Sequence, residues 1–156
     1  MKKFFFDCGT RDATASLGFL ALRMMVGLMM LIGHGIPKIQ NFETILKGGF
    51  YQPDFFPFSL LSSKASLVLT ISAEVVAASL IIFGLMTRPA AFVFGFAMVV
   101  AAFGAHGAAP WFSTGSGPSK ELALMYLIPI IAIILAGAGS YSIDAAIHKE
   151  SKRRRW

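Results

Sequence analysis

Residues 22–39, LRMMVGLMMLIGHGIPKI, are apolar enough to cross a lipid bilayer, yet they contain an arginine and a histidine. Spanning the hydrocarbon core takes about 20 consecutive apolar residues in a helix. A charged side chain at the centre of such a helix costs on the order of 2.5–3.5 kcal/mol. Arg23 and His34 are eleven residues apart, close to a whole number of helical turns, so both fall on one stripe with Gly27 and Met30. We therefore expect this stripe to face the interior of a helical bundle.

The composition of the 156-residue chain is typical of a membrane protein. Apolar residues make up 56% and charged residues 14%, whereas soluble domains carry about 25% charged residues. The mean hydropathy is +0.69. The single cysteine, Cys8, excludes an internal disulfide. Residues 1–10 lack the order of a cleavable signal peptide, so we expect the N-terminus to be retained and Cys8 to be a reduced thiol near the cytoplasmic face.

Four apolar segments predict the fold class, an all-α membrane protein with a four-transmembrane-helix antiparallel bundle. The predicted spans are residues 15–34, 65–86, 89–106 and 121–138. Only Thr87, Arg88 and Pro89 separate the second span from the third, so we expect a tight cytoplasmic turn there, with Pro89 in the first turn of the new helix.

The connection between the first two spans is long and aromatic. It runs for about thirty residues, from Gly35 to Lys64, and contains the stretch GGFYQPDFFPFSLL. Aromatic side chains favour the membrane–water interface. We therefore expect a long outer loop that folds back onto the outer leaflet, with a short helix near residues 42–47.

Basic residues predict the orientation, because cytoplasmic loops of membrane proteins carry an excess of Lys and Arg. One side of the predicted bundle carries nine, namely Lys2, Lys3, Arg11, Arg88, Lys149, Lys152, Arg153, Arg154 and Arg155. The other side carries four, namely Lys38, Lys47, Lys64 and Lys120. Both termini are therefore predicted to be cytoplasmic. The chain then divides into a cytoplasmic segment 1–14, a four-helix transmembrane domain 15–147 and a basic cytoplasmic tail 148–156. Beside a membrane helix such a tail favours contact with anionic lipid over nucleic-acid binding.

Ionisable residues inside the predicted spans are candidates for pairing, because polar groups in membrane helices usually face the bundle interior. Counting from the predicted span ends places Arg23 and Glu74 at similar depth on antiparallel helices. We therefore predict a structural ion pair between Arg23 and Glu74.

A second group of polar residues gathers at the predicted outer end. His34 ends the first span, His106 ends the third, Glu121 begins the fourth, and Lys38 lies one turn beyond His34. With Glu74, they are our candidate ligand-binding residues, because histidines and carboxylates can relay protons or hydrogen-bond a quinone carbonyl. The alternative is that they are helix-end residues that touch lipid headgroups. Haem ligation by the two histidines, and a metal site with Glu121, are weaker readings, and we expect no metal.

Three motifs resemble those of the DoxX family. Residues 22–39 resemble its opening signature, an arginine and a glycine followed by His-Gly-x-x-Lys. ISAEVVAASLIIFGLMTRPAA, residues 71–91, resembles its glutamate-bearing helix, and residues 120–147 resemble its fourth helix with the ending Gly-x-Gly-x-Tyr-Ser-x-Asp. The matching positions are Arg23, Gly27, His34, Gly35, Lys38, Glu74, Gly84, Thr87, Arg88, Glu121, Tyr141 and Asp144.

The resemblance implies a four-helix protein of the bacterial inner membrane, related to the membrane subunit of a thiosulfate:quinone oxidoreductase. Other members are described as partners in membrane-associated redox complexes. We therefore expect a membrane subunit of a redox-linked complex that binds a quinone or similar lipid-soluble molecule, with a soluble or peripheral redox protein as partner and no covalent cofactor. The alternatives are a non-enzymatic scaffold that recruits a soluble partner, and a small-molecule or lipid transporter. The oligomeric state is left open, a homo-oligomer included.

Overall fold

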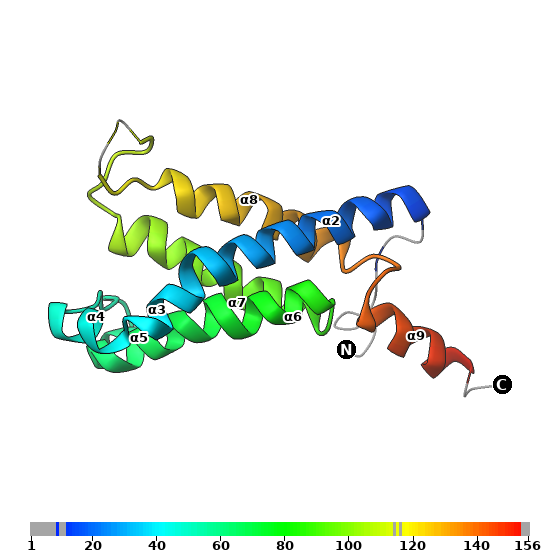
Figure 1. Ribbon diagram of the computed structural model, residues 1–156, viewed down its shortest axis with the longest axis horizontal. Helices are drawn as coiled ribbons and strands as arrows, with labels where there is room; N and C mark the ends of the chain where they lie inside the picture. The colour runs from blue at the N-terminus through cyan, green and yellow to red at the C-terminus, as the bar shows by residue number, and fades with distance from the viewer. Residues whose placement is uncertain (1–8, 10–11, 114, 116, 154–156) are drawn as a thin grey trace.

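The computed structural model describes residue 9, residues 12–113, residue 115 and residues 117–153. All regular secondary structure in these residues is helical, and Figure 1 shows its arrangement. The elements in chain order are α2 (Ala13–Met30), η1 (Leu31–Gly35), α3 (Ile36–Gln40), α4 (Phe42–Gly48), η2 (Phe58–Leu60), α5 (Ser63–Ser72), η3 (Ala73–Ala77), α6 (Ala78–Phe83), α7 (Thr87–Val99), η4 (Val100–Ala105), α8 (Glu121–Ala136) and α9 (Ile143–Arg153).

Several of these elements join end to end into three helices that are long and apolar enough to cross a membrane, in the part of the chain that is described. They are Ala13–Gln40, Ser63–Phe83 and Thr87–Ala105, close to the first three predicted spans. The fourth predicted span is α8, which has 16 residues. At 1.5 Å per residue α8 is about 24 Å long, somewhat shorter than the roughly 30 Å hydrocarbon core.

Local sequence explains where the long helices begin. The side chain of Asp12 accepts a hydrogen bond from the backbone nitrogen of Ala15 (2.7 Å), and Ser62 Oγ accepts one from the backbone nitrogen of Ala65 (3.2 Å). Such N-caps satisfy backbone donors that have no partner within the helix. The first two long helices therefore each begin directly after a polar capping residue that precedes an apolar run.

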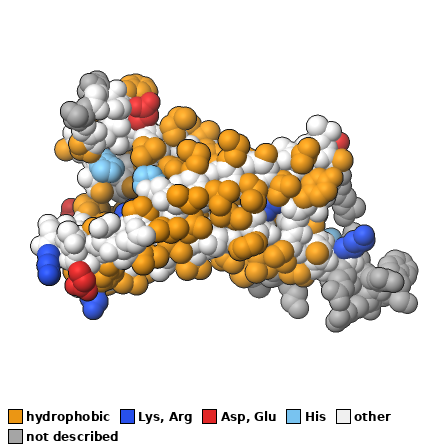
Figure 2. Space-filling view, in the orientation of Figure 1, with side chains coloured by type: hydrophobic (Ala, Val, Ile, Leu, Met, Phe, Trp, Pro, Cys, Tyr) orange, Lys and Arg blue, Asp and Glu red, His pale blue; other side chains and the backbone are white. Residues whose placement is uncertain are grey.

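The helices pack through small residues and expose large apolar ones. Gly27 lies so close to the second long helix that a Cβ there would come within 3.1 Å of the backbone oxygen of Ala78. Small residues of this kind let membrane helices approach closely. Large apolar side chains instead cover much of the outside of the bundle (Figure 2), among them Met25, Ile32, Phe92, Ile128 and Leu135. An apolar outer surface of this extent suits lipid contact and not water.

The segment between the first two long helices packs beside the third. It contains α4, so the short helix predicted at residues 42–47 is present. The ring of Phe58 lies 5.4 Å from that of Phe96 on α7. The Tyr51 hydroxyl lies against Gly104 of η4. These contacts fix the loop against the side of the third long helix.

The C-terminal region contains a helix that crosses the predicted boundary at residue 148. The chain leaves α8 at Gly137 and forms α9, which begins before the predicted boundary at residue 148 and continues into the predicted tail. The break comes from Gly137 and Gly139, both with positive φ, which end the apolar helix. Most of the predicted segment 1–14, including Cys8, lies outside the described residues, as do residues 154–156 of the tail.

Candidate functional site

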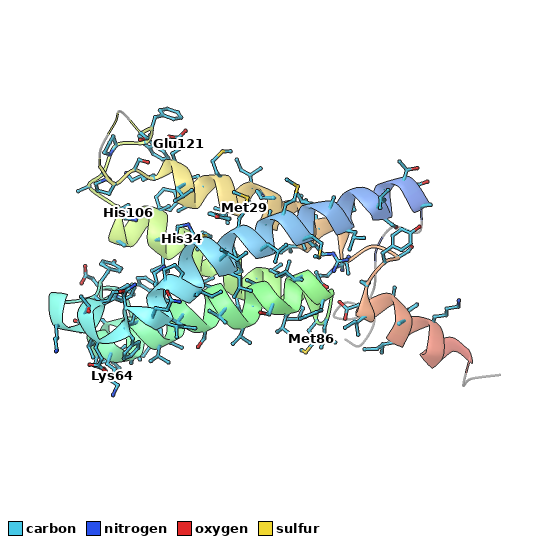
Figure 3. The ribbon with its side chains drawn as sticks, in the orientation of Figure 1. Met29, His34, Lys64, Met86, His106 and Glu121 are labelled. Atoms are coloured by element: carbon cyan, nitrogen blue, oxygen red, sulfur yellow. The ribbon has the colours of Figure 1, made fainter. Side chains whose placement is uncertain are left out.

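A cavity of about 550 Å³ lies between the long helices, near one end of the bundle. All five candidate ligand-binding residues line it, namely His34, Lys38, Glu74, His106 and Glu121. Figure 3 shows three of them, His34, His106 and Glu121, toward the end of the bundle that lies away from Met86. We call this end the cavity end. The opposite end, where α6 turns into α7, is the clasp end.

Each of the three long helices contains a π-helical segment beside the cavity. η1 carries His34, η3 carries Glu74, and η4 ends directly before His106. A π turn holds an extra residue, so it changes the direction of neighbouring side chains, and it is frequent at functional sites. The three segments explain how residues from different helices turn toward one cavity.

An ion pair joins two of these helices at the cavity wall. Lys38 Nζ on α3 lies 2.5 Å from Glu74 Oε1 and 2.6 Å from Glu74 Oε2 on η3. The side chains retain 23% and 6% of their exposure, so the pair is largely withdrawn from solvent. A buried carboxylate without a partner would carry a large desolvation cost, and Lys38 offsets it. Its two contacts with Lys38 therefore fix the Glu74 carboxylate beside the cavity.

Tyr126 is a cavity residue that our sequence reasoning missed. Its ring meets the ring of His34 edge-on, with centroids 5.7 Å apart and planes at 87°. It also packs on Phe94, with a centroid separation of 6.2 Å. The available signal was a phenol inside the otherwise apolar run LALMYLIPII of residues 122–131. The hydroxyl of a buried tyrosine usually has a hydrogen-bond partner, because burying it without one is costly.

The rim of the cavity is formed by Glu121 and the loop before it. Glu121 Oε2 accepts a hydrogen bond from the backbone nitrogen of Ser113 (2.8 Å). Lys120 Nζ lies 4.9 Å from the ring centroid of Trp111, and the Trp111 ring packs edge-on against Phe103 of η4. Ser113 itself lines the cavity. The described residues of this loop therefore form part of the cavity wall at this end of the bundle.

The predicted ion pair between Arg23 and Glu74 is wrong. Arg23 is fully buried, but its Nη1 donates to the backbone oxygens of Ile81 (3.1 Å) and Ile82 (3.5 Å), and its Nη2 donates to that of Tyr141 (2.7 Å). Ile81 stands seven residues beyond Glu74, which is about 10 Å of helix rise. Arg23 and Glu74 therefore lie at different heights. Arg23 instead holds the end of α6, where a positive charge is favoured by the helix dipole.

Asp144 organises the same end of the bundle. Its carboxylate accepts hydrogen bonds from the backbone nitrogens of Met86 (2.9 Å) and Thr87 (2.9 Å) and from Thr87 Oγ1 (2.8 Å). Its own backbone nitrogen donates to the Gly84 oxygen (2.9 Å). We call Arg23, Gly84, Thr87, Tyr141 and Asp144 the clasp, because together they join the first, second and third long helices to α9.

The turn in the clasp begins earlier than the sequence predicted. The reversal occupies Gly84 to Met86, both with positive φ, and Thr87 is already the first residue of α7. Arg88 Nη2 donates to the Leu135 oxygen of α8 (3.3 Å). Thr87 and Arg88 thus have structural contacts here and lie apart from the cavity.

The cavity offers hydrogen-bonding groups beside apolar surface. His34, Lys38 and Tyr126 carry potential donors, Glu121 carries an acceptor, and the cavity wall also contains the apolar side chains of Met30, Met98, Leu122 and Met125. The described residues contain no group of three or more His, Cys, Asp or Glu side chains placed to hold a metal ion. The arrangement suits an organic ligand with an apolar body and a few polar atoms.

Comparisons with known proteins identify the family of this chain. A family model, DoxX, matches residues 18–107, which include Arg23, His34, Glu74 and His106. Two proteins of Haemophilus influenzae, both described as uncharacterized, are similar along most of their length. One is 30% identical over 135 residues, covering 85% of this chain and 92% of its own, and the other is 28% identical over 152 residues, covering 96% of each. No solved structure matches. The chain is a multi-pass membrane protein of the DoxX family.

Proposed function

We propose that this protein is the membrane subunit of a redox-linked complex and holds a quinone, or a similar lipid-soluble ring compound, in its cavity. The observation that carries the proposal is the convergence of His34, Lys38, Glu74 and Tyr126 on one cavity inside an apolar bundle. Ligand pockets commonly measure about 300–1,000 Å³ and combine apolar walls with a few placed polar groups. The cavity has both properties.

The position of the cavity supports a ligand that arrives from the lipid. Leu122 and Met125 line the cavity and yet are 52% and 63% exposed on α8. The first long helix and α8 diverge toward this end of the bundle (Figure 1). A molecule dissolved in the bilayer therefore has an apolar approach to the cavity, and its polar ring atoms meet donors only inside.

The residues present fit a quinone. A quinone ring has carbonyl oxygens at opposite edges and needs donors for them and an apolar slot for its faces. His34 and Tyr126 supply donors on one side, and Met30 and Met98 supply soft apolar contact. When bound, a quinone would supply electron-accepting chemistry, and this chain would bind and orient it. The electrons would come from a partner protein, so the chain is not proposed as an enzyme alone.

The same proposal includes a topology. We propose that α8 with residues 137–142 makes a fourth crossing, that both termini are cytoplasmic, and that the membrane is a bacterial cytoplasmic membrane. The crossing is supported by the ends of α8: Glu121 lies at the cavity, whereas the chain after α8 reaches the clasp through Tyr141 and Asp144. The excess of basic residues on the clasp side supports the orientation.

Binding of a short-chain benzoquinone and a naphthoquinone to the purified protein tests the function. We expect saturable binding, measured by quenching of tryptophan fluorescence, that weakens about 3- to 10-fold in His34→Gln, because one hydrogen bond to the ligand contributes about 0.5–1.5 kcal/mol. His148→Gln is the matched control, since His148 lies on α9 and outside the cavity. If both variants bind the quinone as tightly as the unchanged protein does, the proposed site is wrong. An alkyl alcohol of similar length controls for partition into detergent.

A further inference from the structure

The buried polar side chains of the described residues divide into two groups along the bundle. Glu74, beside the cavity, and Ser66, eight residues before it on the same long helix, belong to the cavity end. The others belong to the clasp end, namely Ser16, Arg23, Thr87 and Asp144. This division leaves a middle layer whose buried side chains are apolar.

The middle layer is closely filled. Ala78, Ile81, Phe94, Ile130 and Ile133 are all 0% exposed, and they come from the second and third long helices and from α8. Phe94 packs directly below Tyr126, which is part of the cavity wall. We call these five residues the plug. Met30 at the cavity and Arg23 in the clasp are seven positions apart, about 10 Å of rise, and none of the six residues between them has a buried polar side chain.

The plug and the clasp together close one route to the cavity. A proton crosses protein along hydrogen-bonding groups or water, and neither is favoured in a close-packed apolar layer. On the clasp side of the plug, both terminal nitrogens of Arg23 donate to backbone oxygens. The Asp144 carboxylate accepts from the N-terminus of α7. On the opposite side of the cavity, His106, Ser113 and Glu121 form a polar rim.

We infer that the cavity exchanges protons with the aqueous phase at the cavity end only. The group at the centre of this exchange is His34. The charged and titratable groups around it are Lys38 on its own long helix, Glu74 on η3, His106 after η4, and Tyr126 and Glu121 on α8, all of which line the same cavity. Glu121 and His106, at the ends of their helices, belong to the polar rim and lie between these groups and the aqueous phase.

The consequence for a ligand rests on the proposed function. When a bound quinone accepts two electrons from a redox partner protein, each carbonyl oxygen takes up one proton and the product is the quinol. On the inference above, both protons come from the cavity end, and oxidation of a quinol returns them there. Proton uptake and release then have one defined side of the membrane.

Histidine titration in vesicles tests the inference on the unaltered chain. The sequence contains only three histidines, and His148 on α9 serves as an internal control for the clasp end. The protein, labelled with ¹⁵N-histidine and inserted in one direction, is examined by solid-state NMR. The pH is set independently on the two sides, over a range wide enough to bring each histidine signal to both of its end states. His34→Gln, His106→Gln and His148→Gln assign the signals.

We expect the His34 and His106 signals to shift when the pH changes at the cavity end and to stay unchanged when the pH changes at the clasp end. The His148 signal is expected to shift only when the pH changes at the clasp end. A His34 signal that follows the clasp-end buffer, both buffers or neither overturns the inference. Quinone binding is measured separately in the same vesicles. Absent binding with one-sided titration removes the proposed function and leaves the one-sided access, so the two failures are distinguishable.

Discussion

The carboxylate of Asp144 caps the helix that begins at Thr87, although the two residues are 57 positions apart in the chain. Asp144 Oδ2 accepts from both the backbone nitrogen and the hydroxyl of Thr87. A helix N-terminus is usually capped by a residue directly before it. Here the preceding residue is Met86, which has no polar side-chain atom for the task, and the cap comes from α9.

Replacing Asp144 by alanine is expected to destabilise the protein by about 2–4 kcal/mol, because buried donors lose a charged acceptor. Asp54→Ala is the matched control, since Asp54 is exposed in the loop between the first two long helices. Thermal unfolding in a mild detergent, followed by circular dichroism, measures both. Equal midpoints for the two variants would contradict the role of the cap.

Gly84→Ala is expected to prevent stable folding or to lower the unfolding midpoint strongly. A Cβ at Gly84 would collide with the Arg23 guanidinium, and the φ of +68° is unfavourable for alanine. Gly33→Ala is the matched control, because no atom lies within 4 Å of its added Cβ. Yield of monodisperse protein after detergent extraction is the measurement. Comparable yields from both variants would show that the turn tolerates a side chain.

The Lys38–Glu74 pair is expected to show strong coupling. Lys38→Met or Glu74→Leu alone leaves a largely buried charge, which typically costs about 3–5 kcal/mol, whereas the double variant removes both charges and costs much less. Unfolding free energies of the single and double variants give the coupling directly. Lys64→Met, at an exposed position, controls for the loss of a lysine. Additive effects of the two single changes would argue against the pair.

Tyr126→Phe is expected to keep the packing on His34 and to weaken quinone binding about 2- to 10-fold through loss of one hydroxyl. Tyr141→Phe is the control, because Tyr141 is 52% exposed and contributes its backbone oxygen, not its hydroxyl, to Arg23. Binding affinity together with the unfolding midpoint separates a ligand contact from a structural one. A loss of stability without a loss of affinity would assign Tyr126 to packing.

Long apolar runs made most of the helical framework predictable from the sequence. The predicted spans 15–34, 65–86 and 89–106 each overlap an observed long helix, because twenty apolar residues leave few alternatives in lipid. The burial of charged residues was also predictable: Arg23 is buried, as the stripe argument expected, and Glu74 is buried, as expected of an ionisable residue inside a span. The partners of these two residues were not predictable, because pairing depends on the relative heights of side chains along the bundle to within one helical turn.

The candidate site was also predictable only in part. His34, Glu74 and His106 could be nominated because each is polar at a defined place in an apolar helix. The π-helical segments that orient these side chains have no recognisable sequence pattern, because a π turn differs from an α turn by one extra residue and not by composition. Tyr126 was missed because a single hydroxyl hardly changes the apolar character of its run.

The Arg23–Tyr141 hydrogen bond has a consequence for how the protein is made, because its two residues are 118 positions apart. During translation the first helix reaches the membrane long before residue 141 is synthesised. Until then, the Arg23 guanidinium must stay at the membrane–water interface or bind another group temporarily. The bundle can therefore be completed only after residue 141 has been synthesised. Chains truncated before Tyr141 should insert their early helices and then be degraded as unfinished products.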